Sequence, residues 1–471
     1  MDNYKKISLM KTLIYGALLS LFFLFACTQK KEKASLEIDD FEIIKERKEL
    51  VVLTLYSSVS YFIYRGEEMG YEYDLVKSYA ESQGLSLKIK VADNVNQLTE
   101  MLEAKEGDLI AFNIPISNQM KENILYCGQE SINEQVLVQR ANKKDTLIKD
   151  VTQMIGKEVY VVANSKFDKR LSNLNQELGG GIIIKTIDKD TISVEDLIGL
   201  VATTDNEIIY TLSDKNIARL NKTYHPNINY DLAISHPQRS SWAVRLSGAN
   251  LAASIDEWFK NYKKQTNYSA TIKRYFERSK LSQIEGIPIL DNGNISIFDN
   301  MFKHYATQIS WDWRLLSSIA YQESRFDTAG VSWAGAVGLM GLMPRTAENF
   351  GLDANKRTNP EGNIKASIEY IRSLEKAFTR VEDAEEKKKF ILASYNAGLG
   401  HIKDAQALAR KLNKNPYIWE ANVEECLKLK SLPEFYNDSV CKQGYFRGSE
   451  TFDYVKQVIK RWKYYEQKVQ L

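Results

Sequence analysis

YQESRF, residues 321–326, is the stretch that decides the fold of the second half of this chain. It ends a run with helical character, residues 315–322, so its one carboxylic acid, Glu323, falls near the end of a helix. Three further stretches follow it in order: GLMGLMP at 338–344, SYNAG at 394–398 and ETFDYV at 450–455. An acid, a Gly/Met turn, a Tyr-Asn pair and a late Tyr in one domain predict a shared site.

The sequence around these stretches predicts a mainly α domain. From residue 298 onward the apolar residues recur at helical spacing. Two examples are the series Ile364, Ile368, Ile371, Leu374, which follows Asn363, and the series Phe390, Leu392, Ala393, Tyr395. Gly286, Pro288, Asn292 and Gly293 break the preceding helix, so residues 281–297 are predicted to be a linker.

The first half of the chain has a different pattern, in which apolar strands alternate with helices. Strands are predicted at 50–55, 85–91 and 108–112, and helices at 70–82 and 95–104. This alternation indicates an α/β domain with a parallel sheet.

Composition limits the classes of function. The 471 residues are 44% hydrophobic and 26% charged, and the net charge is +2. This length and composition fit a globular protein with more than one core. The small net charge gives no overall positive potential that would attract nucleic acid. There is no CxxC and the four His are scattered, so no metal site and no cofactor are predicted.

The N-terminus predicts export and lipid attachment. Lys5, Lys6 and Lys11 precede an apolar run at 13–26, which is typical of a signal peptide. The run ends in LFAC, and Cys27 is followed at once by polar residues, as in a lipoprotein cleavage box. We therefore expect residues 1–26 to be removed, Cys27 to carry lipid, and residues 27–47 to be a tether. An ordinary signal anchor with an incidental Cys is the alternative.

Three cysteines remain after export into an oxidising compartment. Cys426 and Cys441 lie close in sequence and could form a disulfide, which would leave Cys127 as a lone thiol. Sequence alone does not establish that pairing.

The four stretches of the second half resemble the catalytic domain of lytic transglycosylases, the goose-lysozyme-like enzymes that cut peptidoglycan. The resemblance implies that Glu323 protonates the glycosidic oxygen and then takes a proton from the sugar C6 hydroxyl, which gives a 1,6-anhydro product. Partial burial beside Ile319, Ala320 and Phe326 would suit this double role.

The same resemblance implies roles for five further residues. Ser324 would bond Glu323 or the substrate's acetamido group, the alternative being a bond to backbone. Met340 would offer a backbone carbonyl to the sugar amide, Tyr395 and Asn396 would lie near the acid, and Tyr454 would orient it. Glu450 is expected to be structural, and Asp312 and Asp327 are the other nearby acids. Asp327 follows Glu323 by one helical turn and is expected to cap a loop, the alternative being a second carboxylate of the site. Gly341 departs from the family, which often has Gln there.

The first half resembles family-3 periplasmic solute-binding domains through GYEYDL at 70–75, GDLIAFN at 107–113 and EQVLVQR at 134–140. The resemblance implies two lobes, with lobe 2 at about 141–238 and a return crossover at 242–245. The Arg that usually grips an amino-acid carboxylate is missing, and Lys121 is a poorer substitute. The residues left to line a cleft are Tyr56, Ser57, Ser58, Tyr61 and Asn113.

A signal Cys, a solute-binding domain at 48–280 and a catalytic domain at 298–471 together resemble the membrane-bound lytic murein transglycosylase F family. The family implies an outer-membrane lipoprotein that cleaves peptidoglycan glycan strands. From the fusion of the two domains we expect the first to bind a wall-derived ligand, a muropeptide or stem peptide, and to regulate the second. Two alternatives remain open: a hydrolytic muramidase on the same scaffold, and a non-catalytic receptor that only holds glycan.

Overall fold

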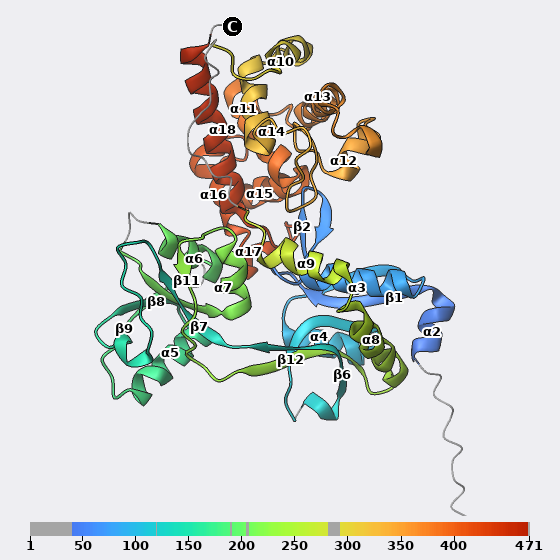
Figure 1. Cartoon of the computed structure of the whole chain (residues 1–471), viewed down its shortest axis with the longest axis vertical. Coiled ribbons are helices and arrows are strands. Elements are labelled where there is room, and N and C mark those ends of the chain that lie inside the picture. Colours follow the sequence, from blue (N-terminus) through green and yellow to red (C-terminus); the bar gives the residue numbers. More distant parts are fainter. Residues whose placement is uncertain (1–39, 119, 189–190, 204–206, 281–292, 470–471) are drawn as a thin grey trace, which may run out of the picture.

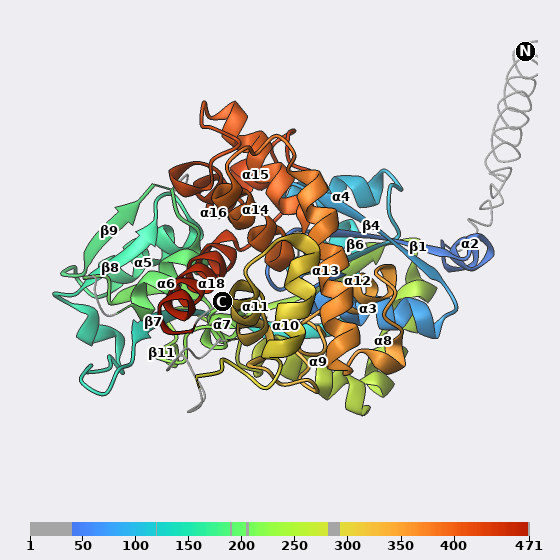
Figure 2. The same cartoon turned by 90° about the horizontal axis from the view of Figure 1, so that it is seen from above.

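The computed structural model describes residues 40–118, 120–188, 191–203, 207–280 and 293–469. It has an α/β first half built of two lobes and a helical second half that lies across both of them (Figures 1 and 2). The predicted signal peptide and Cys27 lie outside the described residues, as does most of the predicted linker.

Lobe 1 is a five-stranded sheet of order β4-β1-β5-β12-β6, in which β1 is parallel to both β4 and β5. Its first strand is buried on both faces from Leu50 to Thr54, because helices cover both sides of the sheet. The elements are β1 (Glu49–Leu55), α3 (Tyr71–Ser82), β4 (Ser86–Ala92), α4 (Val95–Glu103), β5 (Leu109–Pro115) and α8 (Ala249–Tyr262). The alternation predicted from sequence is confirmed for this lobe.

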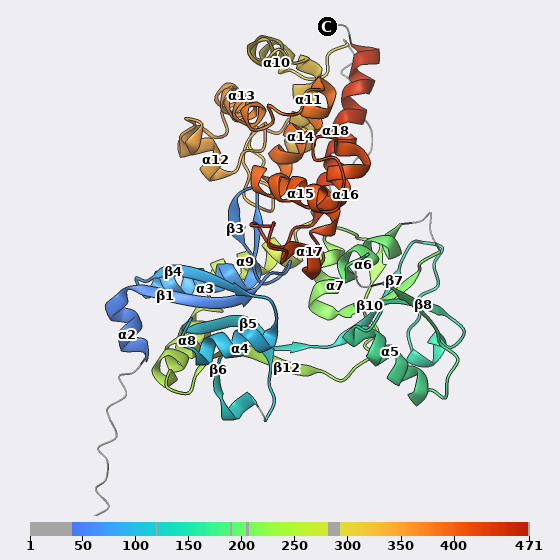
Figure 3. The same cartoon turned by 180° about the vertical axis from the view of Figure 1, so that it is seen from behind.

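Lobe 2 is a second five-stranded sheet, of order β11-β7-β10-β8-β9. Its elements are β7 (Gln135–Arg140), β8 (Glu158–Val162), α5 (Lys166–Glu177), β9 (Ile183–Ile187), α6 (Val194–Ala202), β10 (Tyr210–Asp214), α7 (Lys215–Lys222) and β11 (Ile228–Asn229). Two long antiparallel strands, β6 (Ile124–Asn133) and β12 (Gln238–Arg245), connect the lobes along the side opposite the helical domain (Figure 3).

One part of the predicted tether is folded. Residues 40–47 form helix α2 (Asp40–Arg47), which buries Phe41 and Ile44 against lobe 1. Asp40 is also buried and accepts hydrogen bonds from Arg245 and Ser247. The expectation of an unstructured segment up to residue 47 is therefore wrong. The two apolar residues lie three apart, which is too short a pattern to identify a helix.

The helical domain packs around one core. Helix α9 (Thr266–Phe276) precedes it, and its helices are α10 (Asp299–Ala306), α11 (Trp313–Ser324), α12 (Pro344–Asn349), α13 (Pro360–Ala377), α14 (Ala384–Ala397), α15 (Leu399–Lys411), α16 (Glu424–Leu429), α17 (Pro433–Tyr436) and α18 (Gly448–Lys468). Helix α18 runs beside α11 and α14, so the late ETFDYV stretch is brought to the YQESRF and SYNAG stretches.

Two insertions join the halves. A hairpin of lobe 1, β2 (Phe62–Tyr64) and β3 (Glu67–Met69), rises into the helical domain (Figure 1), where Tyr64 and Met69 become part of the helical core. In return, α17 and the chain around it, residues 431–449, enter the space between the two lobes (Figure 3). We call residues 62–69 the hairpin and residues 431–449 the interlobe segment.

The interlobe segment contacts both lobes. On the lobe 1 side, Gly444 lies against the ring of Tyr56 so closely that a Cβ would be 2.1 Å from it. On the lobe 2 side, Tyr445 donates to Glu195 over 3.1 Å and Arg447 pairs with Glu195 at 3.2 Å. Closing the lobes toward one another therefore requires this segment to leave.

Two further observations concern the envelope predictions. Within the described residues, no helix combines the length and apolar character needed to cross a bilayer. Cys127, Cys426 and Cys441 are free thiols in the structure. The disulfide between Cys426 and Cys441 is not formed here and stays a prediction.

Candidate active site

Helix α11 carries Glu323 in its last turn. Asp312 caps the start of the helix by accepting from the Arg314 N–H. The helix stops abruptly because Arg325 and Phe326, which directly follow its last residue, adopt left-handed φ values of 55° and 67°. Two successive non-glycine residues in that region are uncommon and cost energy, and the stop leaves Glu323 facing the rest of the domain.

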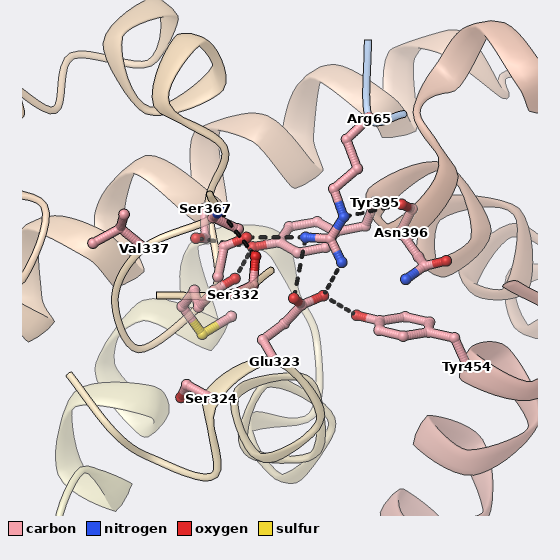
Figure 4. A network of polar contacts seen from close by, with 12 residues as sticks. Arg65, Glu323, Ser324, Ser332, Val337, Ser367, Tyr395, Asn396 and Tyr454 are labelled. Atoms are coloured by element: carbon pink, nitrogen blue, oxygen red, sulfur yellow. Dashed lines mark hydrogen bonds and ion pairs between the residues drawn. The ribbon is translucent and has the colours of Figure 1, made fainter. Parts of the chain in front are cut away.

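Tyr454 on α18 donates to Glu323. Its hydroxyl lies 2.9 Å from Oε1 (Figure 4), and the Glu323 side chain is only 6% exposed. Burial, and next the negative charge of Glu323, raise the pKa of Tyr454 well above its ordinary value. The phenol therefore stays a donor and fixes one oxygen of the acid.

The Tyr-Asn pair lies at the end of α14, and neither side chain bonds Glu323 in the structure. The Tyr395 hydroxyl donates to the Met340 carbonyl over 2.8 Å. Asn396 accepts a hydrogen bond from Thr451 over 2.6 Å, which ties α14 to α18. Both residues are buried, so they shape the wall behind the acid.

The Gly/Met turn forms the other wall of the site. Gly341 has φ +60°, and a Cβ there would lie 2.4 Å from Glu323 Oε2. Ser324 donates to the carbonyls of Leu339 and Ala320, so its hydroxyl bonds backbone and not Glu323. Met340 is fully buried, and its carbonyl faces Tyr395. The carbonyl of this turn next to the acid belongs to Gly341, and it accepts from Arg65.

Arg65, at the tip of the hairpin, occupies the site. Its guanidinium lies 3.1 Å from each oxygen of Glu323 and donates to the carbonyls of Gly341 and Asn396, each over 3.0 Å (Figure 4). Its own N–H donates to the Ala397 carbonyl over 3.1 Å. A two-pronged contact of this kind is stronger and more specific in geometry than a single hydrogen bond to the carboxylate.

Sequence reasoning did not find Arg65. Arg65 lies 258 residues before Glu323, in a separately folded domain. The local sequence YRG, residues 64–66, indicates only an ordinary turn. The one available signal was its neighbour Gly66, which has φ +79° and permits the tight tip. That signal predicts a turn but not what the turn contacts.

The other acids near Glu323 have structural partners. Asp327 accepts from the Ala329 N–H and closes a loop, as expected, and Asp312 bonds Arg314 and Trp462. Glu450 lies with Lys280 and Arg447 around a small cavity between the domains, where burial raises its pKa. Among the described residues, Glu323 bonds Arg65 and Tyr454 and none of these three acids. Among the described residues no cluster of His, Cys, Asp and Glu is placed to hold a metal.

The residues predicted to line the solute cleft make different contacts in the structure. Tyr56 stacks on Tyr61 at 5.6 Å and meets Tyr436 of the interlobe segment edge-on. Asn113 donates to the buried Glu72 over 2.8 Å. Ser57 accepts from the Ser60 N–H, while Ser58 Oγ is buried with no partner, beside the same interdomain cavity as Glu450.

Comparison with known proteins identifies both halves. Residues 49–278 match the model for bacterial extracellular solute-binding proteins, family 3, and residues 300–418 match that for the transglycosylase SLT domain. The second match spans Glu323, the Gly/Met turn and the Tyr-Asn pair.

Similar proteins extend over nearly the whole chain. A protein of Desulfosudis oleivorans named membrane-bound lytic murein transglycosylase F is 29% identical over 90% of this chain and 91% of its own length. A protein of the same name from Pseudomonas fluorescens Pf-5 is 29% identical over 88% of this chain and 84% of its own. The unliganded, open L-cystine receptor of Neisseria gonorrhoeae is 16% identical, with a TM-score of 0.42, over 52% of this chain and 99% of that one. The chain joins a family-3 solute-binding domain to a transglycosylase SLT domain, and over nearly its whole length it is similar to proteins named membrane-bound lytic murein transglycosylase F.

Proposed function

We propose that this protein cleaves the β-1,4 bond between MurNAc and GlcNAc in peptidoglycan and leaves a 1,6-anhydro-MurNAc end. The observation that carries the proposal is a buried acid, Glu323, held by a phenol in an SLT domain that also carries the Gly/Met turn and the Tyr-Asn pair.

One carboxyl group can serve both steps if the sugar supplies the nucleophile. Protonated Glu323 gives its proton to the glycosidic oxygen as the C1–O bond breaks, and GlcNAc leaves as an alcohol. The Glu323 carboxylate then takes the proton of the MurNAc C6 hydroxyl as that oxygen bonds to C1. No water is consumed, and the enzyme returns to its starting state. Tyr454 would hold one oxygen of Glu323 in place throughout.

The mass of the products tests this chemistry. Purified peptidoglycan would be digested with the protein, with Glu323→Gln, and with Glu361→Gln as a control at an exposed acid of the same domain. We expect anhydro-muropeptides from the wild type and the control and none from Glu323→Gln. Products heavier by one water would identify a hydrolytic muramidase. No products, even after Arg65 is removed, would favour the non-catalytic receptor.

We further propose that the solute-binding domain lowers the activity of the enzyme until a wall-derived ligand, a muropeptide or stem peptide, closes its lobes. Two contacts support the proposal. Arg65 covers both oxygens of Glu323, and the interlobe segment occupies the space that lobe closure would need. A ligand that binds only the closed lobes would therefore favour the state in which the hairpin is withdrawn. The difference between the ligand's affinities for the open and closed lobes sets the size of this shift.

Substitution of Arg65 tests this regulation. Arg65→Ala should release the site and raise the activity of the full chain without ligand, about tenfold or more if the ion pair contributes 1.4 kcal/mol or more to docking. Arg65→Lys keeps one charge but loses the two-pronged contact and should give an intermediate rate. Arg239→Ala removes an exposed Arg from lobe 1 and should change nothing. Equal rates for all four proteins, with and without muropeptides, would refute the regulation.

We also propose that the protein is an outer-membrane lipoprotein anchored through Cys27 and facing the periplasm. The proposal rests on the signal-like N-terminus and on the name of the relatives, which calls them membrane-bound. Cys27→Ala should abolish incorporation of labelled palmitate and move the protein from the membrane fraction to the soluble fraction. Unchanged fractionation would contradict the lipid anchor, and separation of the two membranes would identify which one holds it.

A further inference from the structure

The turn beside the acid, residues 337–342, is a closed loop whose carbonyls are all accounted for. Val337 N–H donates to the Leu342 carbonyl over 2.9 Å, and Gly341 N–H donates to the Gly338 carbonyl over 3.0 Å. The remaining carbonyls receive donors from different elements: Leu339 from Ser324 of α11, Met340 from Tyr395 of α14, Gly341 from Arg65 of the hairpin and Val337 from Asn363 of α13.

Asn363 makes more bonds to this region than any of the other three donors. Its side chain is fully buried in the first turns of α13. Oδ1 accepts from the Met340 N–H over 2.7 Å, while Nδ2 donates to the carbonyls of Val337 over 3.2 Å and Arg357 over 3.0 Å. A side-chain amide has two N–H donors and one acceptor oxygen, and here all of them bind main chain of the turn and of the segment behind it.

The turn fits against the amide with no spare room. Gly338 has φ +86°, and a Cβ there would lie 2.5 Å from Asn363 Nδ2 and 2.4 Å from the Arg357 carbonyl oxygen. The backbone of residue 338 can approach this closely only because it is a glycine. Asn363 and Gly338 together thus determine the path of the turn.

The path of the turn determines where Gly341 lies relative to Glu323. Gly341 is next to Met340, whose N–H is held by Asn363 and whose carbonyl is held by Tyr395. Ser367 supports the same region: its hydroxyl lies 3.1 Å from that of Tyr395 and donates to the Asn363 carbonyl (Figure 4). Gly341 in turn lies against Glu323. Asn363 acts on the acid through Met340 and Gly341.

We propose that Asn363 is a positioning residue of the transglycosylase site, which rests on the proposed function. Its amide holds the turn so that Gly341 excludes water from one side of Glu323 and keeps a main-chain carbonyl beside it. Without the amide, the buried Met340 N–H and the part-buried carbonyls of Val337 and Arg357 lose their partners, and the turn must rearrange to satisfy them. The acid then faces a wider, wetter site and protonates the glycosidic oxygen less well.

Asn363→Asp tests the proposal because Asp has the same shape but a different set of donors. The aspartate can still accept from Met340 N–H, but when ionised it repels the carbonyls of Val337 and Arg357. When protonated it can donate to one of them. We expect the ratio of variant to parent activity to be about 0.01 at pH 8 and to rise at least fivefold by pH 5. Asn363→Ala should lose activity without this recovery.

The Asn363 variants must be compared with a parent protein whose site is not covered by Arg65, and with a control for lost stability. The parent is the full chain with Arg65→Ala, and the series is repeated with Arg65 present. Gln406→Ala removes another buried amide, which donates to the Pro416 carbonyl over 2.7 Å on α15. It should lower the melting temperature while its activity ratio stays within about twofold of one and does not change with pH.

Each outcome decides the proposal. A pH-dependent ratio for Asn363→Asp, measured below the melting temperatures of all variants, supports it. A ratio that is flat with pH, or activity that falls only with the folded fraction in both Asn363 variants, assigns Asn363 to folding alone and overturns it. A parent that releases no anhydro products refutes the proposed function instead.

Discussion

The carboxyl group of Glu323 packs so closely against Gly341 that no side chain fits at position 341. A Cβ at position 341 would lie 2.4 Å from Glu323 Oε2 and 2.8 Å from its Cβ. Gly341→Ala should therefore push the acid out of place and lower kcat about tenfold or more, as expected when a reacting group shifts by a fraction of an ångström. Steady-state rates on purified glycan strands would measure the loss.

Gly351→Ala is a matched control for this change. Gly351 has φ +80°, close in backbone strain to the +60° of Gly341, but a Cβ there would meet nothing within 4 Å. Both variants should lose about 1–2 kcal/mol of stability from the left-handed backbone. Only Gly341→Ala should lose activity, and equal activity in the two would show that the close approach to Glu323 does not matter.

Tyr454 is the second residue whose effect follows from one contact. A hydrogen bond to a charged group contributes about 1.5–3 kcal/mol, and Tyr454→Phe removes only the hydroxyl. We expect kcat to fall about 10- to 100-fold with little change in KM, measured on the full chain carrying Arg65→Ala. Tyr464→Phe, half-buried on the same helix, is the control. A wild-type rate for Tyr454→Phe would contradict a role in holding the acid.

At the scale of helices and strands, the sequence predicts those elements that a local pattern of apolar residues encodes. The strands and helices of lobe 1 follow from apolar runs and alternation, and α11, α13 and α14 follow from helical spacing. The family resemblance carried by the four stretches predicted that Tyr454 would orient Glu323, although 131 residues separate them. The hairpin and α17 were not predicted as contacts because their partners lie in the other domain, and no local pattern records a partner. Met340 was assigned a ligand contact that its complete burial does not allow in this conformation.

Helix α3 carries a pH-sensitive link to the crossover strand β12. Glu72 is buried, and its oxygens accept from Trp242 over 2.7 Å and Asn113 over 2.8 Å. Burial raises its pKa to about 7, although the two hydrogen bonds lower it. The folded protein therefore holds this proton more tightly than the unfolded chain. Stability from this group is complete below about pH 4.5 and is lost as pH rises toward 7.

Urea unfolding of the wild type and of Glu72→Gln would measure that loss. Between pH 4.5 and 8 we expect the wild type to lose about 3 kcal/mol from this group, while Glu72→Gln lacks this decline. Glu257→Gln, at an exposed acid on α8, should behave as the wild type. Parallel curves for all three proteins would show that Glu72 ionises alike in both states.

At the scale of the whole molecule, the two halves bind each other through two separate insertions, the hairpin and the interlobe segment. The hairpin enters the helical core with Tyr64 and Met69, while the interlobe segment meets lobe 2 through polar groups. The Arg447–Glu195 pair is nearly buried, with side chains 11% and 12% exposed, and Ser431 donates to Asp196 over 2.7 Å. Breaking one partner of such a buried pair is costly because the other charge is left without compensation.

Glu195→Arg would therefore undock lobe 2 by placing a second cation against Arg447. If lobe 2 contact and hairpin insertion belong to one docked state, this variant should raise activity without touching the hairpin. The double variant with Arg65→Ala should then be no more active than the more active single variant, since one open state is reached by either route. Glu158→Arg, at an exposed pair on the far strands of lobe 2, controls for the added charge. Multiplicative rates in the double variant would show instead that the hairpin and the interlobe segment release independently, so that lobe closure alone does not uncover Glu323.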